Sequence, residues 1–184
     1  VLTTPTGAGT TWSVTVTSCG TGTVRLQLEP KTVSDGTTVG PPQLIAAHAV
    51  TIDRSLPTAT APKVSLDLGA TISGSTLRGT ITWTGSDSGS GIATYDIARS
   101  TDGATFAVLS TGLATPSLAV GMTSGHHYRY EVRAHDKAGN TGSWVAASTW
   151  YPSLVQQTST AVTWTGAWST VTSTNDSGGS ARAS

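Results

Sequence analysis

Residues 128–134 read YRYEVRA, so apolar and charged side chains alternate at every position. Tyr128 and Tyr130 fall on one side of this segment, and Arg129 and Glu131 fall on the other. Successive side chains of a β-strand point to opposite faces, so a period of two predicts a strand with one buried face. The letters DKAGN follow, and these residue types are typical of a turn. We therefore expect the chain to fold around β-sheets.

Three further segments alternate in the same way: TLRGTITWT, IATYDIARS and SLAVGM. Asp-Gly at 102–103 is a strong hairpin signal, because both residue types tolerate positive φ. Strands at intervals of roughly 8–12 residues are typical of a sandwich. The pattern predicts a seven-strand antiparallel sandwich in the middle of the chain. Its predicted interior holds Leu77, Ile81, Trp83, Tyr95, Ile97, Tyr128, Tyr130 and Val132.

Charge argues against two classes of partner. Only 11% of the residues are charged, and ten basic residues balance ten acidic ones. Nucleic acids and anionic membranes attract basic patches, so neither is an expected partner. The sequence has no apolar run of the roughly 18 residues that a membrane-spanning helix needs, so we expect no membrane insertion.

Proline-containing and turn-rich segments divide the chain. The stretch TVRLQLEP followed by VSDGTTVGP parallels YRYEVRAHDKAGNTG, which indicates a weak internal repeat. Cys19 is the single cysteine, so no disulfide forms within the chain, and its own state stays open. The predicted units are the C-terminal part of a preceding Ig-like β-domain (1–56), a proline-containing linker (57–62), a β-sandwich (63–152) and the start of a truncated third β-domain (153–184).

The middle unit resembles a fibronectin type III domain or a related bacterial Ig-like surface repeat. The matching residues are Trp83 in ITW, Tyr95 on the next strand, and Tyr128 at the tyrosine-corner position of Y-x-Y-x-V-x-A. The segments SDSGSGIATY and DKAGNTGSW are similar to motifs of such repeats, and VTIDRSLPT resembles the joint that ends one repeat. VQQTSTAVTWTGAW is similar to the opening of jelly-roll-like domains in exported bacterial proteins. The resemblance implies an all-β, Ig-like antiparallel sandwich flanked by incomplete β-domains, and a Tyr128 hydroxyl bonded to the backbone upstream.

Glycoside chemistry requires a pair of carboxylates, and four aspartates are candidates for it. Asp87, Asp102 and Asp136 stand beside glycine, serine or lysine in predicted turns, where aspartate accepts backbone N–H bonds. Asp96 is expected on the exposed face of its strand. The sequence therefore predicts no catalytic residue.

Metal binding was weighed at two places. His126 and His127 are adjacent and point to opposite faces of a strand, while His48 and His135 lie on other segments. The letters DKAGN fit either a calcium loop or a hairpin connection. The connection is favoured, with its glycine and asparagine at positive φ, because the EF-hand spacing of acidic residues is absent. No metal ligand and no cofactor are predicted.

The aromatic residues divide into a core set and a surface set. Exposed aromatic rings can stack on the apolar faces of sugars, and Trp150, Tyr151 and Trp164 are the candidates for this role. Core packing is the favoured use of the tryptophans, with Trp144 closing one end of the sandwich. The residues expected to form the structural core are Trp83, Tyr95, Tyr128, Tyr130 and Trp144.

These observations favour a non-catalytic spacer or interaction module of a secreted or cell-surface multi-domain bacterial protein. Its export signal is expected outside this sequence, and its expected partners are the neighbouring domains of the same chain, a polysaccharide or a cell-surface protein. The alternative is an accessory carbohydrate-binding unit of an extracellular glycoside hydrolase, in which case exposed coplanar aromatics are expected on one face.

Overall fold

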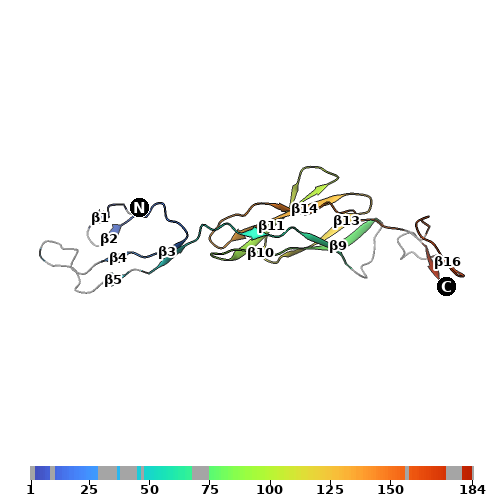
Figure 1. Ribbon diagram of the computed structural model, residues 1–184, viewed down its shortest axis with the longest axis horizontal. Coiled ribbons are helices and arrows are strands. Elements are labelled where there is room, and N and C mark those ends of the chain that lie inside the picture. Colours follow the sequence, from blue (N-terminus) through green and yellow to red (C-terminus); the bar gives the residue numbers. More distant parts are fainter. Residues whose placement is uncertain are drawn as a thin grey trace.

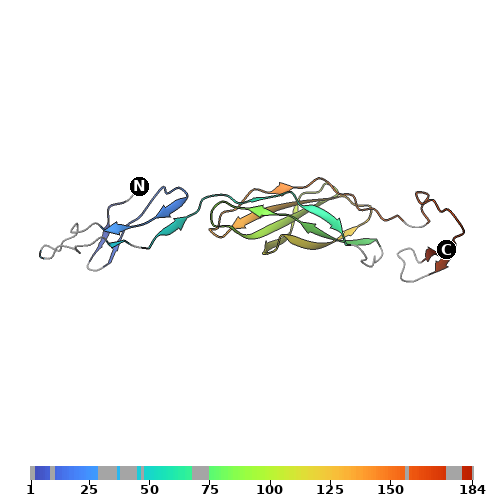
Figure 2. The same ribbon diagram turned by 60° about the horizontal axis from the view of Figure 1, so that its bottom comes forward.

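The structure, a computed structural model, describes residues 3–8, 11–28, 37, 45–46, 48–67, 75–155, 158–172 and 180–183. Every regular element within these ranges is a β-strand. The strands form three groups that follow one another along the long axis of the molecule (Figures 1 and 2). Strands β1–β6 lie at one end, β7–β15 form the middle, and β16–β17 lie at the other end.

The two terminal groups consist of two-stranded antiparallel pairs. The pairs are β1 (Thr6–Ala8) with β2 (Thr11–Ser13), β3 (Gly22–Val24) with β6 (Val50–Ile52), β4 (Gln27–Leu28) with β5 (Ile45–Ala46), and β16 (Ser169–Thr172) with β17 (Ser180–Ala183). The side chains described between residues 3 and 52 are all exposed or half-buried, so they enclose no core of their own. In the described part of the chain, no helix is long and apolar enough to cross a membrane.

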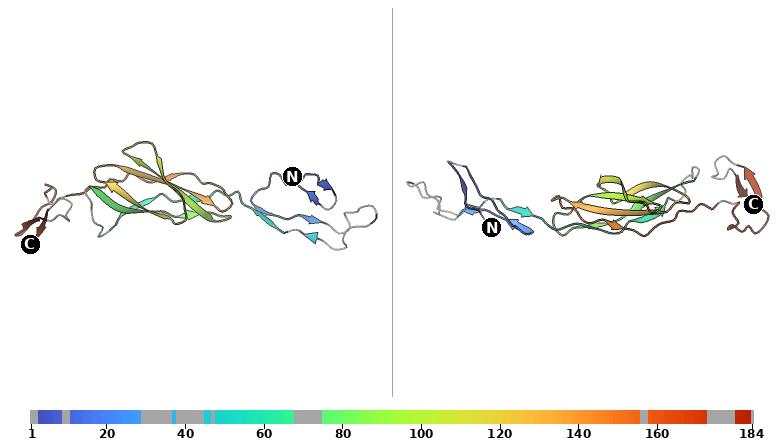
Figure 3. Two further views of the ribbon diagram at one scale, coloured as in Figure 1. Left: turned by 180° about the vertical axis from the view of Figure 1, so that it is seen from behind. Right: turned by 90° about the horizontal axis from the view of Figure 1, so that it is seen from above.

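The middle group is an antiparallel sandwich of two sheets (Figure 3). One sheet has the order β13-β9-β8, and the other has the order β12-β11-β14-β15, so together they have the seven strands that the alternation predicts. The bounds are β8 Lys63–Leu66, β9 Thr76–Thr82, β11 Ile92–Thr101, β12 Ala107–Leu113, β13 Ser117–Thr123, β14 Tyr128–Asp136 and β15 Val145–Ala146.

The core lies between these two sheets. Ile81 and Met122 come from one sheet, Trp83 directly follows β9 of that sheet, and Ile97 and Val132 come from the other sheet. All eight residues predicted to lie inside are buried, at 0 to 6% exposure. Because each sheet alternates, its inner row meets the inner row of the other sheet, and this apolar burial stabilises the fold.

Tyr128 occupies a tyrosine corner, as the resemblance implies. Its hydroxyl oxygen accepts a hydrogen bond at 2.8 Å from the amide of Thr123, five residues upstream. Trp144 differs from its predicted place in the core. It is half-buried, and the guanidinium carbon of Arg133 lies 4.7 Å from its ring centroid. Arg133 is on the outward row of β14, so Trp144 covers the outer face of the sheet and does not close the end of the core.

The segment 57–62, predicted as a linker, is bonded to the sandwich. Strand β7 (Thr58–Ala59) pairs with β10 (Gly85–Ser86), and Pro57 is fully buried. A proline is tolerated here because β7 is an edge strand in a two-stranded pair and the proline stands just before it. The carbonyl of Pro57 lies so close to Gly142 that a Cβ there would come within 2.1 Å of its oxygen. Residues 53–57, which connect β6 to β7, are called the joint below.

Candidate cation site

The first carboxylate of the site stands in the joint, directly after β6. One oxygen of Asp53 accepts the Ser55 amide at 2.8 Å, and the other accepts the Ser90 amide at 2.5 Å. Hydrogen bonds to the charged form favour ionisation. The Ser55 and Ser90 amides accordingly lower the pKa of Asp53 to about 2, so this carboxylate is ionised at neutral pH.

The second carboxylate belongs to the turn between β10 and β11. Asp87 Oδ2 accepts the amides of Gly89 at 3.0 Å and Gly91 at 2.8 Å. These bonds are the turn-forming use that the sequence predicts for this residue. Asp87 Oδ1 is different, because this oxygen is buried and has no hydrogen-bond partner. A buried polar atom without a partner is costly, so this oxygen requires an explanation.

The third carboxylate is the last residue of β14, and its register partner is Ile92 at the start of β11. Asp136 Oδ1 accepts the amides of Ala138 at 2.9 Å and Asn140 at 2.7 Å. These bonds close the predicted hairpin connection, in which Gly139 has a φ of +91°. Asn140, predicted at positive φ, does not adopt it. Its side-chain amide instead donates to Asp136 Oδ2 at 2.7 Å and to the Asp53 carbonyl at 3.1 Å.

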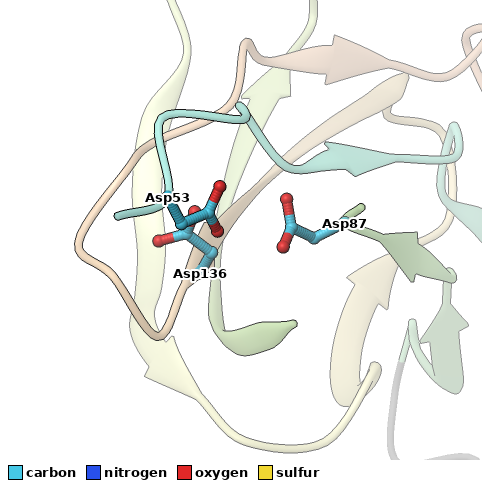
Figure 4. A group of neighbouring side chains, drawn as sticks. All are labelled: Asp53, Asp87 and Asp136. Atoms are coloured by element: carbon cyan, nitrogen blue, oxygen red, sulfur yellow. The ribbon is translucent and has the colours of Figure 1, made fainter. Parts of the chain in front are cut away.

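Asp53, Asp87 and Asp136 converge. One carboxylate oxygen of each lies within 4.8 Å of the chosen oxygens of the other two. Figure 4 shows the Asp87 carboxylate facing those of Asp53 and Asp136. Asp136 is only 3% exposed, and the other two are half-buried. Three oxygens at this spacing are an arrangement that can hold a hard divalent cation.

The sequence indicates only part of this cluster. Turn composition places Asp87 and Asp136 each in its own turn, and no motif points to Asp53. The missed signal is positional, because Asp136 ends β14 while Asp87 precedes β11, the antiparallel neighbour of β14. In an antiparallel pair, the loop that follows one strand and the loop that precedes the other lie at the same edge of the sheet. The place of Asp53 depends on β7 joining the sandwich, which the proline content of 57–62 concealed.

The histidines do not gather at a site. His126 Nδ1 pairs with Asp102 Oδ2 at 2.6 Å, and the His127 ring lies 4.4 Å from that of Tyr151. His135 stands at the opposite end of β14 from His127. Asp102 has a φ of +52°, as its hairpin requires, and backbone and side-chain bonds from His127 and His126 lower its pKa. Among the described residues, only the three aspartates form a group of three that fits a metal.

Asp96 is buried at 5% exposure, although alternation places it on the exposed face. Its Oδ2 accepts bonds from Arg133 Nε at 2.9 Å and His135 Nε2 at 2.8 Å, and its Oδ1 accepts the Gly112 amide at 3.1 Å. Burial alone would raise the pKa of Asp96, but the bonds from His135, Arg133 and Gly112 outweigh it and lower the pKa. These partners account for every oxygen of the carboxylate, so we assign Asp96 to stability.

The predicted glycan-stacking residues differ in their exposure. Tyr151 is 63% exposed, whereas Trp150 is half-buried and packs against the core. Trp164 is 37% exposed, and its ring is tilted by 58° from that of Trp168. Tyr151 is therefore the candidate that presents the most ring surface.

The sequence matches no protein-family model and no curated protein. Among solved structures, the chain is similar to a Fn3-like protein from Clostridium thermocellum. The two share 22% identity with a TM-score of 0.34, over 53% of this chain and 95% of that one. This likeness concerns the fold alone.

Proposed function

We propose that this chain is a non-catalytic spacer and interaction module of a secreted or cell-surface multi-domain bacterial protein. The observation that carries the proposal is the bonding of the joint to the sandwich. Asn140 and Ser90 both donate to Asp53, and β7 pairs with β10 directly after the joint. A connection held on two sides keeps the preceding strands in a set direction relative to the sandwich, which is the property that a spacer requires.

The middle unit supplies no competing chemistry within the described residues. The buried carboxylate Asp96 is fully bonded, and backbone amides hold the carboxylates of Asp53, Asp87 and Asp136 in their turns. General acid–base catalysis requires a titratable group within reach of a substrate. A structural role therefore suits both sets of carboxylates better than a catalytic role.

The spacer role is tested by measuring whether the joint is rigid in solution. Residual dipolar couplings of amides in β3 and β6 and of amides in the sandwich are expected to fit one alignment tensor. Asn140→Ala is expected to require two tensors, while Thr115→Ala, at an exposed loop position, is expected to behave as the original chain. Independent tensors for the original chain would contradict the proposal.

The carbohydrate-binding alternative rests on the exposed ring of Tyr151. Screening the chain and its Tyr151→Ala variant against a glycan array tests it. Binding that is lost in Tyr151→Ala would favour an accessory carbohydrate-binding unit, and the absence of binders would leave the spacer role as the function.

A further inference from the structure

We propose that Asp53, Asp87 and Asp136 bind a calcium ion that fastens the joint to the sandwich. The purpose assigned to the ion rests on the proposed spacer role, but the binding itself is argued from the cluster alone. The three carboxylates belong to three different segments: the joint, the turn before β11 and the turn after β14.

The spacing of the oxygens fits calcium. Calcium–oxygen distances are about 2.3–2.6 Å, so two ligands on opposite sides of the ion stand up to about 5.2 Å apart. Three oxygens within 4.8 Å of one another lie within this limit for each pair. Magnesium usually keeps several waters and is bound through one or two carboxylates, and zinc prefers nitrogen and sulfur ligands.

The partnerless oxygen of Asp87 points to a ligand independently of this spacing. Asp87 Oδ1 is buried and accepts no hydrogen bond, although Oδ2 of the same carboxylate accepts two. A carboxylate oxygen removed from water requires either a hydrogen-bond donor or a cation. No donor reaches it, and the neighbouring carboxylates that it faces offer only acceptors (Figure 4). A cation satisfies this oxygen, and the other two carboxylates are placed to share that cation.

The charge of the cluster is also uncompensated. The ion pairs among the described residues are His126–Asp102, Arg133–Asp96 and His135–Asp96, and none involves the cluster. Lys137 is a basic residue beside one of these turns, since its Nζ lies 3.9 Å from where a Cβ on Gly91 would be. It forms no ion pair there. Like charges gathered out of water repel strongly, and a divalent ion removes that repulsion.

The remaining oxygens are held by the backbone, which prepares the site. Amides of Ser55, Ser90, Gly89, Gly91, Ala138 and Asn140 donate to the three carboxylates. Because these donors fix the carboxylates before an ion arrives, binding orders few side chains. Calcium sites of extracellular modules have dissociation constants on the order of 10⁻⁴–10⁻³ M, and we expect this range.

The test is a calcium titration of the whole 184-residue chain. The chain is first treated with a chelator, and the titration is then followed through the amide chemical shifts. Saturable shifts are expected at the amides of Gly89, Ser90, Gly91 and Asn140. Asp87→Asn is expected to weaken calcium binding by at least about tenfold, because loss of a charged ligand lowers affinity at such sites. Asp67→Asn, an exposed aspartate bonded to Thr80, is the matched control and should bind as the original chain.

Two further results test the calcium site. Lys137→Met should leave the titration unchanged, whereas calcium binding that appears only in Lys137→Met would mean that the lysine neutralises the cluster, and would overturn the proposal. Absence of saturable shifts up to about 10 mM calcium, well above the expected range, would also overturn it. The fold of each variant is checked from its dispersed amide spectrum, so that loss of binding is separated from unfolding.

The same sample distinguishes the site from the spacer role. Residual dipolar couplings measured with calcium and with chelator should fit one alignment tensor in both, and more closely with the ion than without it. A single tensor fitted equally well under both conditions, without calcium binding, would overturn the calcium site and leave the spacer role. Calcium binding with two tensors under both conditions would support the site but overturn both its fastening of the joint and the spacer role.

Discussion

The rings of Tyr128 and Tyr130 lie nearly parallel, with centroids 6.4 Å apart and planes 16° from each other, yet their hydroxyls have opposite surroundings. The Tyr128 oxygen accepts the Thr123 amide, whereas the buried Tyr130 hydroxyl has only the Arg99 guanidinium nearby, outside good hydrogen-bond geometry. Both side chains stand on the inner row of β14, so the two positions form a matched pair.

Removing each hydroxyl should therefore have different effects. Tyr128→Phe leaves the half-buried Thr123 amide without its acceptor and should lower the free energy of unfolding by about 1–3 kcal/mol. Tyr130→Phe removes a hydroxyl that forms no bond and should change it by less than about 0.5 kcal/mol or raise it. Urea denaturation of the two variants measures the difference. Equal losses would mean that the Tyr130 hydroxyl has a bonded partner after all.

The two faces of β14 should differ in the same assay. Tyr130→Ala empties a site that is 1% exposed and should cost roughly 3–5 kcal/mol, as for other large aromatic truncations in cores. Arg129→Ala removes an exposed side chain that donates to the Ala147 carbonyl, and it should cost within about 0.5 kcal/mol. A large loss at Arg129 combined with a small one at Tyr130 would contradict the assignment of the faces.

The lowered pKa of Asp96 makes the stability of the sandwich depend on pH. A carboxylate whose pKa is lower in the folded state contributes stability that is fully present above its unfolded pKa of about 3.9. That stability is lost as the pH falls below this value and through the folded pKa. Asp96→Asn should be less stable than the original chain at pH 7, and the difference should shrink below about pH 4. Denaturation at several pH values tests this, because the other carboxylates are common to both proteins. A difference that is constant with pH would contradict the role of the Asp96 charge.

The contact between Pro57 and Gly142 should tolerate no side chain. Gly142→Ala places a methyl group against the Pro57 carbonyl. It should lower the free energy of unfolding by about 1–3 kcal/mol, because either the contact is strained or the joint must move away. Gly20→Ala is the control, since a Cβ there meets nothing within 4 Å. Thermal unfolding compares the two. If Gly142→Ala matched Gly20→Ala, the joint would not be packed against the sandwich in solution.

The sequence predicts the inner faces well because alternation reports directly which side of a strand is apolar. Alternation gives the wrong burial for Asp96, because Arg133 and His135 from the neighbouring strand cover this outward-facing side chain. That cover depends on strand register, here Asp96 opposite Arg133, which periodicity does not determine. For the same reason His135→Ala, which alternation alone predicts to be nearly neutral, should cost about 1–2 kcal/mol through its bond to a buried charge.

The cation site escapes sequence reasoning for a related reason. Each aspartate taken alone is explained by its own turn, and only tertiary structure brings them together. Asp53 meets Ser90 and Asn140 across 37 and 87 residues. Its position depends on the segment after it forming an edge strand, and proline-rich composition favours the opposite interpretation.

The chain enters the sandwich at the joint, beside the turn after β14, and leaves it near Trp150, which pairs with Tyr128 at the other end of that strand. Tension applied through neighbouring units would therefore act along the strands. Among the seven strands of the two sheets, the first, β8, and the last, β15, belong to different sheets, so the load would not peel one strand from its neighbour. Ladder hydrogen bonds run across the strands, and a pull along the strands strains many of them simultaneously in shear. The architecture is accordingly one that resists stretching.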